Sequence, residues 1–239
     1  MKTTKIAVLG TGGGGRAHAA KLAALGYEVH VGTRDPEATL ARTEPDMMGN
    51  PPYKQFLAEH PGIHLHTFAD AAAAADEIVI NGIDGHNAVT ALTAIAAQLA
   101  GKTLIDYAVP YLYGAEMEHP WPTPFGTMPK LDPCDTDSLA EQIQRALPNV
   151  KVVKSFVTQE QDTVVNPRAI GGDHTMFLAG NDTEAKKTVT DLLTSYGWTD
   201  ILDLGPLVAA RGMEMYAHMH GAIGMALGIG NHFGVKIVR

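Results

Sequence analysis

A glycine-rich turn close to the N-terminus is the feature that most constrains how this chain folds. Three of its glycines stand at G-x-G-x-x-G spacing: Gly10, Gly12 and Gly15. The turn follows an apolar run, Lys5–Leu9, and precedes a segment, 16–25, in which alanine and leucine recur at helical spacing. A second apolar run, Glu28–Thr33, begins just after Gly26. Together they predict a βαβ unit whose backbone approaches a pyrophosphate at the start of the helix.

The end of the second predicted strand carries an arginine where NAD-selective proteins place a carboxylate. The sequence there reads Gly32-Thr33-Arg34. The Arg34 guanidinium and the Thr33 hydroxyl suit a 2′-phosphate, which a carboxylate would repel, so they predict NADP(H). Two alternatives stay open. Asp35 could be the ribose carboxylate of an NAD site, or Arg34 could be a solvated surface residue.

Strands and helices continue to alternate along the chain. The further strands that we predict are 64–68, 77–83, 103–108, 151–157, 175–179 and 199–204. The further helices are 53–59, 85–100, 138–147, 183–196 and 207–230. This pattern predicts an α/β fold, a Rossmann doubly wound and mainly parallel sheet with a small C-terminal appendage of helix and strand. We divide the chain into an NADP-binding Rossmann domain, 1–160, and a small C-terminal domain, 161–239, that closes the cleft.

The last predicted helix is apolar on nearly every face. Its charged residues and histidines interrupt the run too often for a membrane span, so we expect it in a core or at a subunit interface. Arg211 and Glu214 lie three apart and predict either an intrahelical ion pair or two groups facing the cleft. Its glycines fall roughly on one side and indicate a homodimer: Gly221, Gly224 and Gly228.

Composition excludes several classes of function. The net charge of -8 and the pI near 5.7 argue against a nucleic-acid or anionic-membrane partner. Cys134 is the single cysteine, so no intrachain disulfide and no cysteine-based zinc cluster can form. We expect a cytoplasmic protein, since the N-terminus also lacks secretory features.

The histidines do not suggest a metal site. No carboxylate cluster follows the pair His64 and His66. On a helix, His218 and His220 would point roughly 200° apart, which is too far for both to bind one ion. His174 is interpreted as a satisfied polar group, with a contact made by its loop as the alternative. No motif for nucleophilic catalysis is present, and no catalytic residue is assigned.

Several motifs in order give the chain a resemblance to a known family. They are IAVLGTGGGG, VGTRDP, GGDHTMFLAGND, WTDILDLGPL and GVKIVR. With these the chain resembles the deazaflavin (coenzyme F420)-dependent NADP oxidoreductases and the broader group of NADP-binding reductases related to them. The resemblance implies that hydride passes directly between nicotinamide and deazaflavin in a cleft, with no obligatory acid or base. It also implies the cofactor-binding residues by position: Thr11, Gly12, Gly13 and Gly14 at the pyrophosphate, Thr33 and Arg34 at the 2′-phosphate, and Asn81, Gly82 and Ile83 at the nicotinamide.

Departures from the family pattern leave the second substrate open. Phe156-Val157-Thr158 stands where the family carries a histidine, and Glu160 replaces a proline. The 109–135 loop is rich in proline and could cover the cleft, with Trp121 or Tyr111 as a cap. We therefore predict an NADP(H)-dependent oxidoreductase acting on deazaflavin, a flavin or another small molecule. A non-catalytic NADP(H)-binding sensor is the alternative. An imine or β-hydroxyacid reductase ranks lower, because little chain is left for a helical C-terminal domain.

Overall fold

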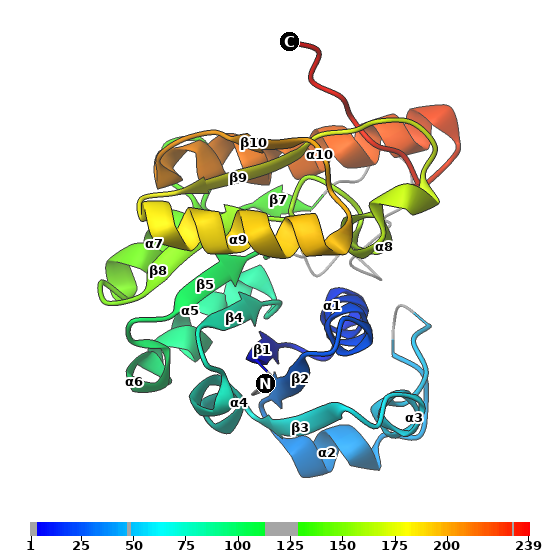
Figure 1. Cartoon of the computed structure of the whole chain (residues 1–239), viewed down its shortest axis with the longest axis vertical. Helices are drawn as coiled ribbons and strands as arrows, with labels where there is room; N and C mark the ends of the chain where they lie inside the picture. The colour runs from blue at the N-terminus through cyan, green and yellow to red at the C-terminus, as the bar shows by residue number, and fades with distance from the viewer. Residues whose placement is uncertain (1–3, 47–48, 113–128, 231) are drawn as a thin grey trace.

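The computed structural model describes residues 4–46, 49–112, 129–230 and 232–239. Its strands are β1 (Lys5–Leu9), β2 (Glu28–Thr33), β3 (Ile63–Thr67), β4 (Ile78–Asn81), β5 (Thr103–Asp106), β6 (Tyr111–Leu112), β7 (Lys130–Leu131), β8 (Lys151–Ser155), β9 (Met176–Gly180) and β10 (Ile201–Asp203). One large sheet has the order β10-β9-β8-β5-β4-β1-β2-β3, and β6 pairs with β7 in a small antiparallel sheet (Figure 1).

The large sheet confirms the predicted Rossmann topology. Its described neighbouring strands are parallel, except that β8 and β9 run antiparallel. The strand order reverses at β1, which lies between β4 and β2, and in such sheets a ligand binds outside the carboxyl ends of the strands at that point. β9 and β10 extend this same sheet, and the division into domains 1–160 and 161–239 stays a prediction.

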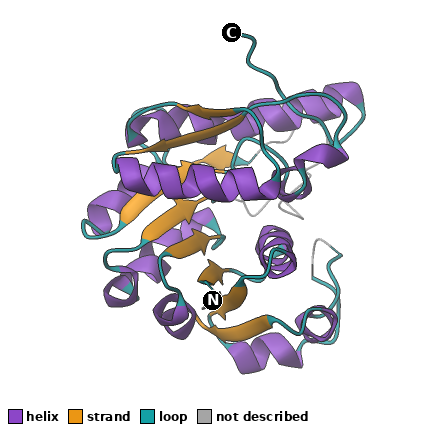
Figure 2. Cartoon of the chain, viewed as in Figure 1, coloured by secondary structure: helices purple, strands orange, loops and turns teal. Residues whose placement is uncertain are grey.

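Helices cover both faces of the sheet (Figure 2). They are α1 (Gly13–Ala24), α2 (Pro36–Ala41), α3 (Tyr53–Glu59), α4 (Phe68–Ala74), α5 (Gly85–Thr93), α6 (Ala96–Leu99), α7 (Leu139–Ala146), α8 (Gln161–Val165), α9 (Thr183–Tyr196) and α10 (Ala210–Leu227). One core packs the sheet against α1, α3, α8 and α9, around residues such as Leu22 and Val189. The other packs it against α4, α5, α6 and α7, around residues such as Leu92 and Ile143.

Local differences from the predicted elements have physical reasons. The helix predicted over 85–100 is wrong as one element, because the chain breaks after α5 to bury Ile95 in the core. α2 and α4 are short and lack the polar and apolar pattern of a longer amphipathic helix, and their caps at Asp35 and Thr67 are the available signal. The capping box predicted at Ser138 and Glu141 is present at the start of α7. None of the helices in the described ranges is long and apolar enough to cross a membrane.

Candidate functional site

A cleft of about 1390 Å³ runs along the carboxyl ends of the parallel strands. The glycine turn, the end of β2 and the segments after β4, β5 and β8 form most of its wall, and α10 closes one end. Of the predicted cofactor residues, those that line it are Gly10, Thr11, Gly12, Thr33, Arg34, Gly82 and Ile83. The structure therefore brings together the two parts of the sequence that predicted a dinucleotide and a 2′-phosphate.

The glycine turn has the tight geometry that its spacing predicts. Gly10 has a φ of 124°, and a Cβ there would lie 2.4 Å from the carbonyl oxygen of Gly82. A Cβ at Gly15 would lie 2.2 Å from the carbonyl oxygen of Gly10. A Cβ at Gly12, by contrast, would meet no atom of the described residues within 4 Å. Gly10 and Gly15 thus allow close backbone packing, whereas Gly12 leaves space for a ligand.

The first turn of α1 offers its backbone amides to that space. Gly12 is the N-cap residue, and no side chain in the described part of the protein caps the helix. Unpaired amides at a helix start attract an anion, as a pyrophosphate would require. Gly13 and Gly14 do not line the cleft: a Cβ at Gly13 would approach Gln161, and one at Gly14 would lie 2.6 Å from the Tyr107 hydroxyl.

The corner after β2 is positively charged. Arg34 and Arg42 both line the cleft, and neither guanidinium forms an ion pair with another described residue. Asp35 also lines the cleft, but its carboxylate caps α2 by accepting a hydrogen bond of 2.9 Å from the backbone N–H of Ala38. Thr33 is buried, and its hydroxyl lies 3.0 Å from that of Thr39. The arrangement favours a 2′-phosphate over a ribose hydroxyl, and sequence reasoning missed Arg42.

Asn81 supports the loop after β4 from below. It is fully buried and does not line the cleft. Its Nδ2 donates to Asp106 over 2.8 Å, and its Oδ1 accepts from the backbone N–H of Ile83 over 3.2 Å. Tyr107 fixes the other side of this loop, since its hydroxyl lies 2.1 Å from where a Cβ of Gly82 would be. Gly82 and Ile83 are thereby held at the wall of the cleft.

Below the cleft, a fully buried lysine joins three parts of the fold. The Nζ of Lys154 lies 2.7 Å from Asp106 Oδ2 and 2.9 Å from Glu214 Oε1, and it donates to the carbonyl of Ala108. Burial opposes the charge on Lys154, but the two carboxylates outweigh it and hold its pKa above the ordinary value. Because Asp106 also holds Asn81, one chain of polar contacts runs from the loop after β4 to α10.

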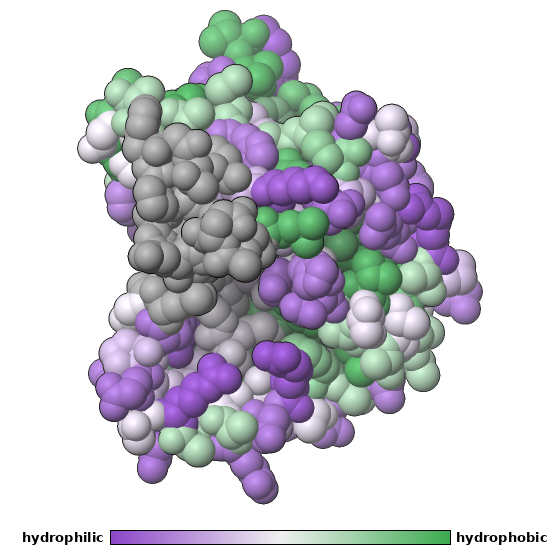
Figure 3. Space-filling view, turned by 180° about the vertical axis from the view of Figure 1, so that it is seen from behind, coloured by the Kyte–Doolittle hydropathy of each residue, from purple (hydrophilic) through white to green (hydrophobic). Residues whose placement is uncertain are grey.

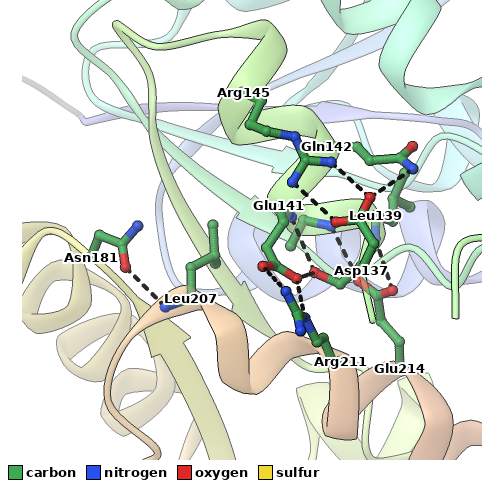
Figure 4. A network of polar contacts seen from close by, with 11 residues as sticks. Asp137, Leu139, Glu141, Gln142, Arg145, Asn181, Leu207, Arg211 and Glu214 are labelled. Carbon is green, nitrogen blue, oxygen red and sulfur yellow. Dashed lines mark hydrogen bonds and ion pairs between the residues drawn. The ribbon is translucent and has the colours of Figure 1, made fainter. Parts of the chain in front are cut away.

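Both alternatives predicted for Arg211 and Glu214 are wrong, because the two residues do not pair with each other and neither lines the cleft (Figure 4). Arg211 forms two bonds of 2.8 Å to Glu141 on α7. Glu214 accepts from the backbone N–H groups of Leu139 and Ala140 at the start of α7. The partners on other elements are favoured because a buried lysine and the backbone amides at the start of α7 would otherwise lack hydrogen-bond partners. The two side chains thereby attach α10 to α7.

The end of the cleft away from Arg34 and Arg42 is mainly aromatic and apolar. Aromatic and apolar residues dominate it: Tyr107, Val109, Phe156, Val157, Val164 and Ala217. Gln159 and Glu160, after β8, and His220, on α10, add polar groups. Burial raises the pKa of the Glu160 carboxyl. The sequence singled out Val157 and Glu160 but missed Gln159 and His220 as residues of the cleft. The only signal for His220 was a polar residue in an apolar helix, and Gln159 stands in a polar run without a signal of its own.

The sequence proposed two aromatic residues as a cap of the cleft. Tyr111 lines the cleft, and Trp121 lies outside the described residues.

Three histidines lie close together on β2 and β3: His30, His64 and His66. The Nδ1 of His30 lies 3.1 Å from the Nε2 of His66. No set of three His, Cys, Asp or Glu side chains within the described ranges has the geometry to hold a metal ion. His174 is buried against Trp198, and its Nε2 has no partner there, so the interpretation as a satisfied residue is wrong.

Comparison with known proteins identifies the family. A family model described as NADP oxidoreductase, coenzyme F420-dependent, matches residues 5–110. A crystal structure from Arthrobacter sp. FB24, described as a candidate F420-dependent NADP reductase, is 47% identical to this chain, with a TM-score of 0.88. It covers 98% of this chain and 99% of its own. The chain belongs to this family. It is an NADP-dependent oxidoreductase, as the motifs predicted.

More distant proteins share the fold. The metalloreductase STEAP3 of Rattus norvegicus is 27% identical over 211 residues, which are 88% of this chain and 36% of the rat protein. The chain thus spans about a third of that relative. An imine reductase from Streptomyces aurantiacus is 18% identical with a TM-score of 0.60, over 94% of this chain and 65% of its own. At that identity the likeness is one of fold.

Buried His18 should make the protein sensitive to acid. It stacks on Phe156, and burial lowers its pKa from 6.5 to about 3. Between those values the unfolded chain binds the proton and the folded chain does not. Unfolding free energy should therefore fall as the pH drops below about 6.5, by roughly 1.4 kcal/mol per pH unit from this group. His18→Gln should reduce that slope in urea titrations at several pH values. The exposed control His86→Gln should keep it, and equal slopes in both variants would contradict the assignment.

Proposed function

We propose that this oxidoreductase transfers a hydride between the nicotinamide of NADP(H) and a planar acceptor of the deazaflavin or flavin class. The observation that carries the proposal is the continuity of the cleft, which joins the phosphate-binding half to an aromatic end. A tricyclic ring needs a flat apolar slot, and Phe156, Val157 and Tyr107 supply such walls next to the nicotinamide loop. The family name points to F420 as the first acceptor to test.

The protein's own contribution is to bind and orient the two rings and to exclude water. Gly10, Gly82 and Ile83 fix the loops against which the nicotinamide would lie. The unpaired amides of α1 and the arginines after β2 would hold the phosphates. NADPH, once bound, supplies the hydride, and the protein supplies the geometry in which the donor and acceptor atoms meet.

The test is turnover with defined acceptors. Purified protein should oxidise NADPH in the presence of F420 or riboflavin, faster than in the absence of either and faster than it oxidises NADH. If it binds NADPH, as its fluorescence would show, but transfers hydride to neither ring, the acceptor class proposed here is wrong.

We further propose that the protein works as a homodimer in the cytoplasm. The glycines that indicated a dimer in the sequence do not support one, because Gly221 and Gly224 are buried within the chain. An exposed face that begins at Val208, just before α10, and continues along α10 supports it instead, with small and apolar residues at alternating steps of three and four: Val208, Gly212, Met215, Met219, Ala222 and Ala226. Figure 3 shows apolar side chains over this end of the molecule. A repeat of this kind suits the same face of a second copy. Sedimentation should give twice the monomer mass of 25.4 kDa, and Met219→Lys should shift it to the monomer.

A further inference from the structure

Two buried polar atoms at the acceptor end of the cleft lack partners. They are the Oε1 of Gln159 and the Nε2 of His220, which form no hydrogen bond within the described part of the chain. Gln159 is 8% exposed, His220 is 7% exposed, and both side chains line the cleft. Leaving a buried polar atom unsatisfied is destabilising, and nearly all such atoms in proteins are paired. In a binding cleft, unpaired atoms indicate a ligand that completes them.

The two residues lie in one neighbourhood although they come from different elements. Gln159 follows β8, and His220 lies on α10. The C-terminal tail joins them. Thr175, whose carbonyl accepts from Gln159, donates its backbone N–H to the carbonyl of Val235 over 2.9 Å, and the ring of Phe233 stacks on His220 with centroids 4.3 Å apart. Both therefore belong to the acceptor end, away from the arginines of the phosphate corner.

Their chemistry specifies what a ligand must present. The Nε2 of Gln159 donates to the carbonyl oxygen of Thr175 over 3.4 Å, which leaves its Oε1 to accept from an N–H of the ligand. Burial lowers the pKa of His220, so its imidazole is neutral and can donate one hydrogen bond, for example to a carbonyl. A ligand with an N–H beside a carbonyl satisfies both atoms.

We propose that Gln159 and His220 recognise the pyrimidinedione edge of a flavin-type ring, where an N–H lies between two carbonyls. Gln159 Oε1 accepts from the ring N3–H, and His220 Nε2 donates to a neighbouring carbonyl. This inference rests on the proposed function, because it assumes an acceptor of that ring class. It makes the two residues specificity determinants for the acceptor, and the chemistry of hydride transfer needs nothing further from them.

The test measures binding. Protein saturated with NADP⁺ is titrated with riboflavin and with 3-methylriboflavin, in which a methyl group replaces the N3 hydrogen, and flavin fluorescence reports the Kd. The wild type should bind the methylated ring roughly 10-fold more weakly, as expected for one lost hydrogen bond to a buried acceptor. In Gln159→Leu, riboflavin should bind about 10-fold more weakly, and the two flavins should bind almost equally. A discrimination that persists in Gln159→Leu would overturn the assignment, since the methyl group would then clash elsewhere.

His174 provides a matched control for His220. Both histidines are 7% exposed with an unpartnered Nε2, but His174 packs on Trp198 and does not line the cleft. His220→Phe should weaken riboflavin binding while His174→Phe leaves it unchanged, with thermal unfolding confirming that both variants fold. Equal binding by the two variants would overturn the role of His220. Tight but undiscriminating flavin binding by the wild type refutes this inference alone, whereas no flavin binding and no turnover refute the proposed acceptor and this inference together.

Discussion

Arg34→Asp should weaken NADPH binding by about 100-fold and leave NADH binding almost unchanged. The guanidinium lines the cleft at the end of β2 without an ion-pair partner among the described residues, and it is placed to form charge-assisted bonds with a 2′-phosphate. Such bonds contribute about 1.5–3 kcal/mol each, and an aspartate adds repulsion of the phosphate. At about 1.4 kcal/mol per tenfold change, the loss amounts to at least two orders of magnitude in Kd.

Calorimetric titration of each variant with NADPH and with NADH measures this effect. Arg168→Asp is the matched control, because Arg168 is exposed like Arg34 but does not line the cleft. It makes the same change of charge and should leave both affinities alone. Equal losses of NADPH and NADH affinity in Arg34→Asp would show that the arginine does not contact the 2′-phosphate. Arg42→Ala should cause a smaller loss in the same direction.

Lys154→Met should destabilise the protein by about 3–5 kcal/mol, because it leaves Asp106 and Glu214 buried without their cation. Guanidinium-induced unfolding measures the change. The exposed lysine Lys187 pairs with Asp191 over the same 2.7 Å, so Lys187→Met tests the same contact without burial. Lys187→Met should lower the free energy of unfolding by less than about 0.5 kcal/mol.

A second substitution distinguishes the loss of the contact between Lys154 and Glu214 from the cost of leaving carboxylates buried without a cation. Adding Glu214→Gln to Lys154→Met removes one of the two buried charges and should restore part of the lost stability. If the double variant is less stable than the single one by the full cost of Glu214→Gln alone, the two residues act independently and the contact between them contributes nothing.

The sequence was sufficient for the Rossmann topology and for the glycine turn and Arg34 at the wall of the cleft. Local rules decide both: a G-x-G-x-x-G turn between a strand and a helix requires its backbone geometry, and Gly10 shows it with a φ of 124°. Arg34 was predictable because its place follows from the end of β2. Arg42 was not, because the short helix α2 that carries it close to the cleft has too little pattern to be recognised.

The end of the cleft that holds Gln159 and His220 depends on contacts between distant segments. Gln159 and His220 are 61 positions apart, and only the packing of α10 beside β8 and the tail brings them to one wall. The partners of Arg211 and Glu214 were mispredicted for the same reason. The spacing of residues along α10 gives no information about Lys154 on β8 or Glu141 on α7. Side chains that meet through tertiary packing leave no periodic signal.

The buried lysine also sets a rule for recombining this protein with its relatives. A chimaera that joins residues 1–110 of this chain to the remainder of a relative would keep β1 to β5 and exchange β8, β9, β10 and α10. Such a graft separates Asp106 from Lys154 and Glu214. We expect such a chimaera to lose stability unless the incoming segment brings a cation at the position of Lys154 and a carboxylate opposite it, because Asp106 would otherwise lie buried without its cation.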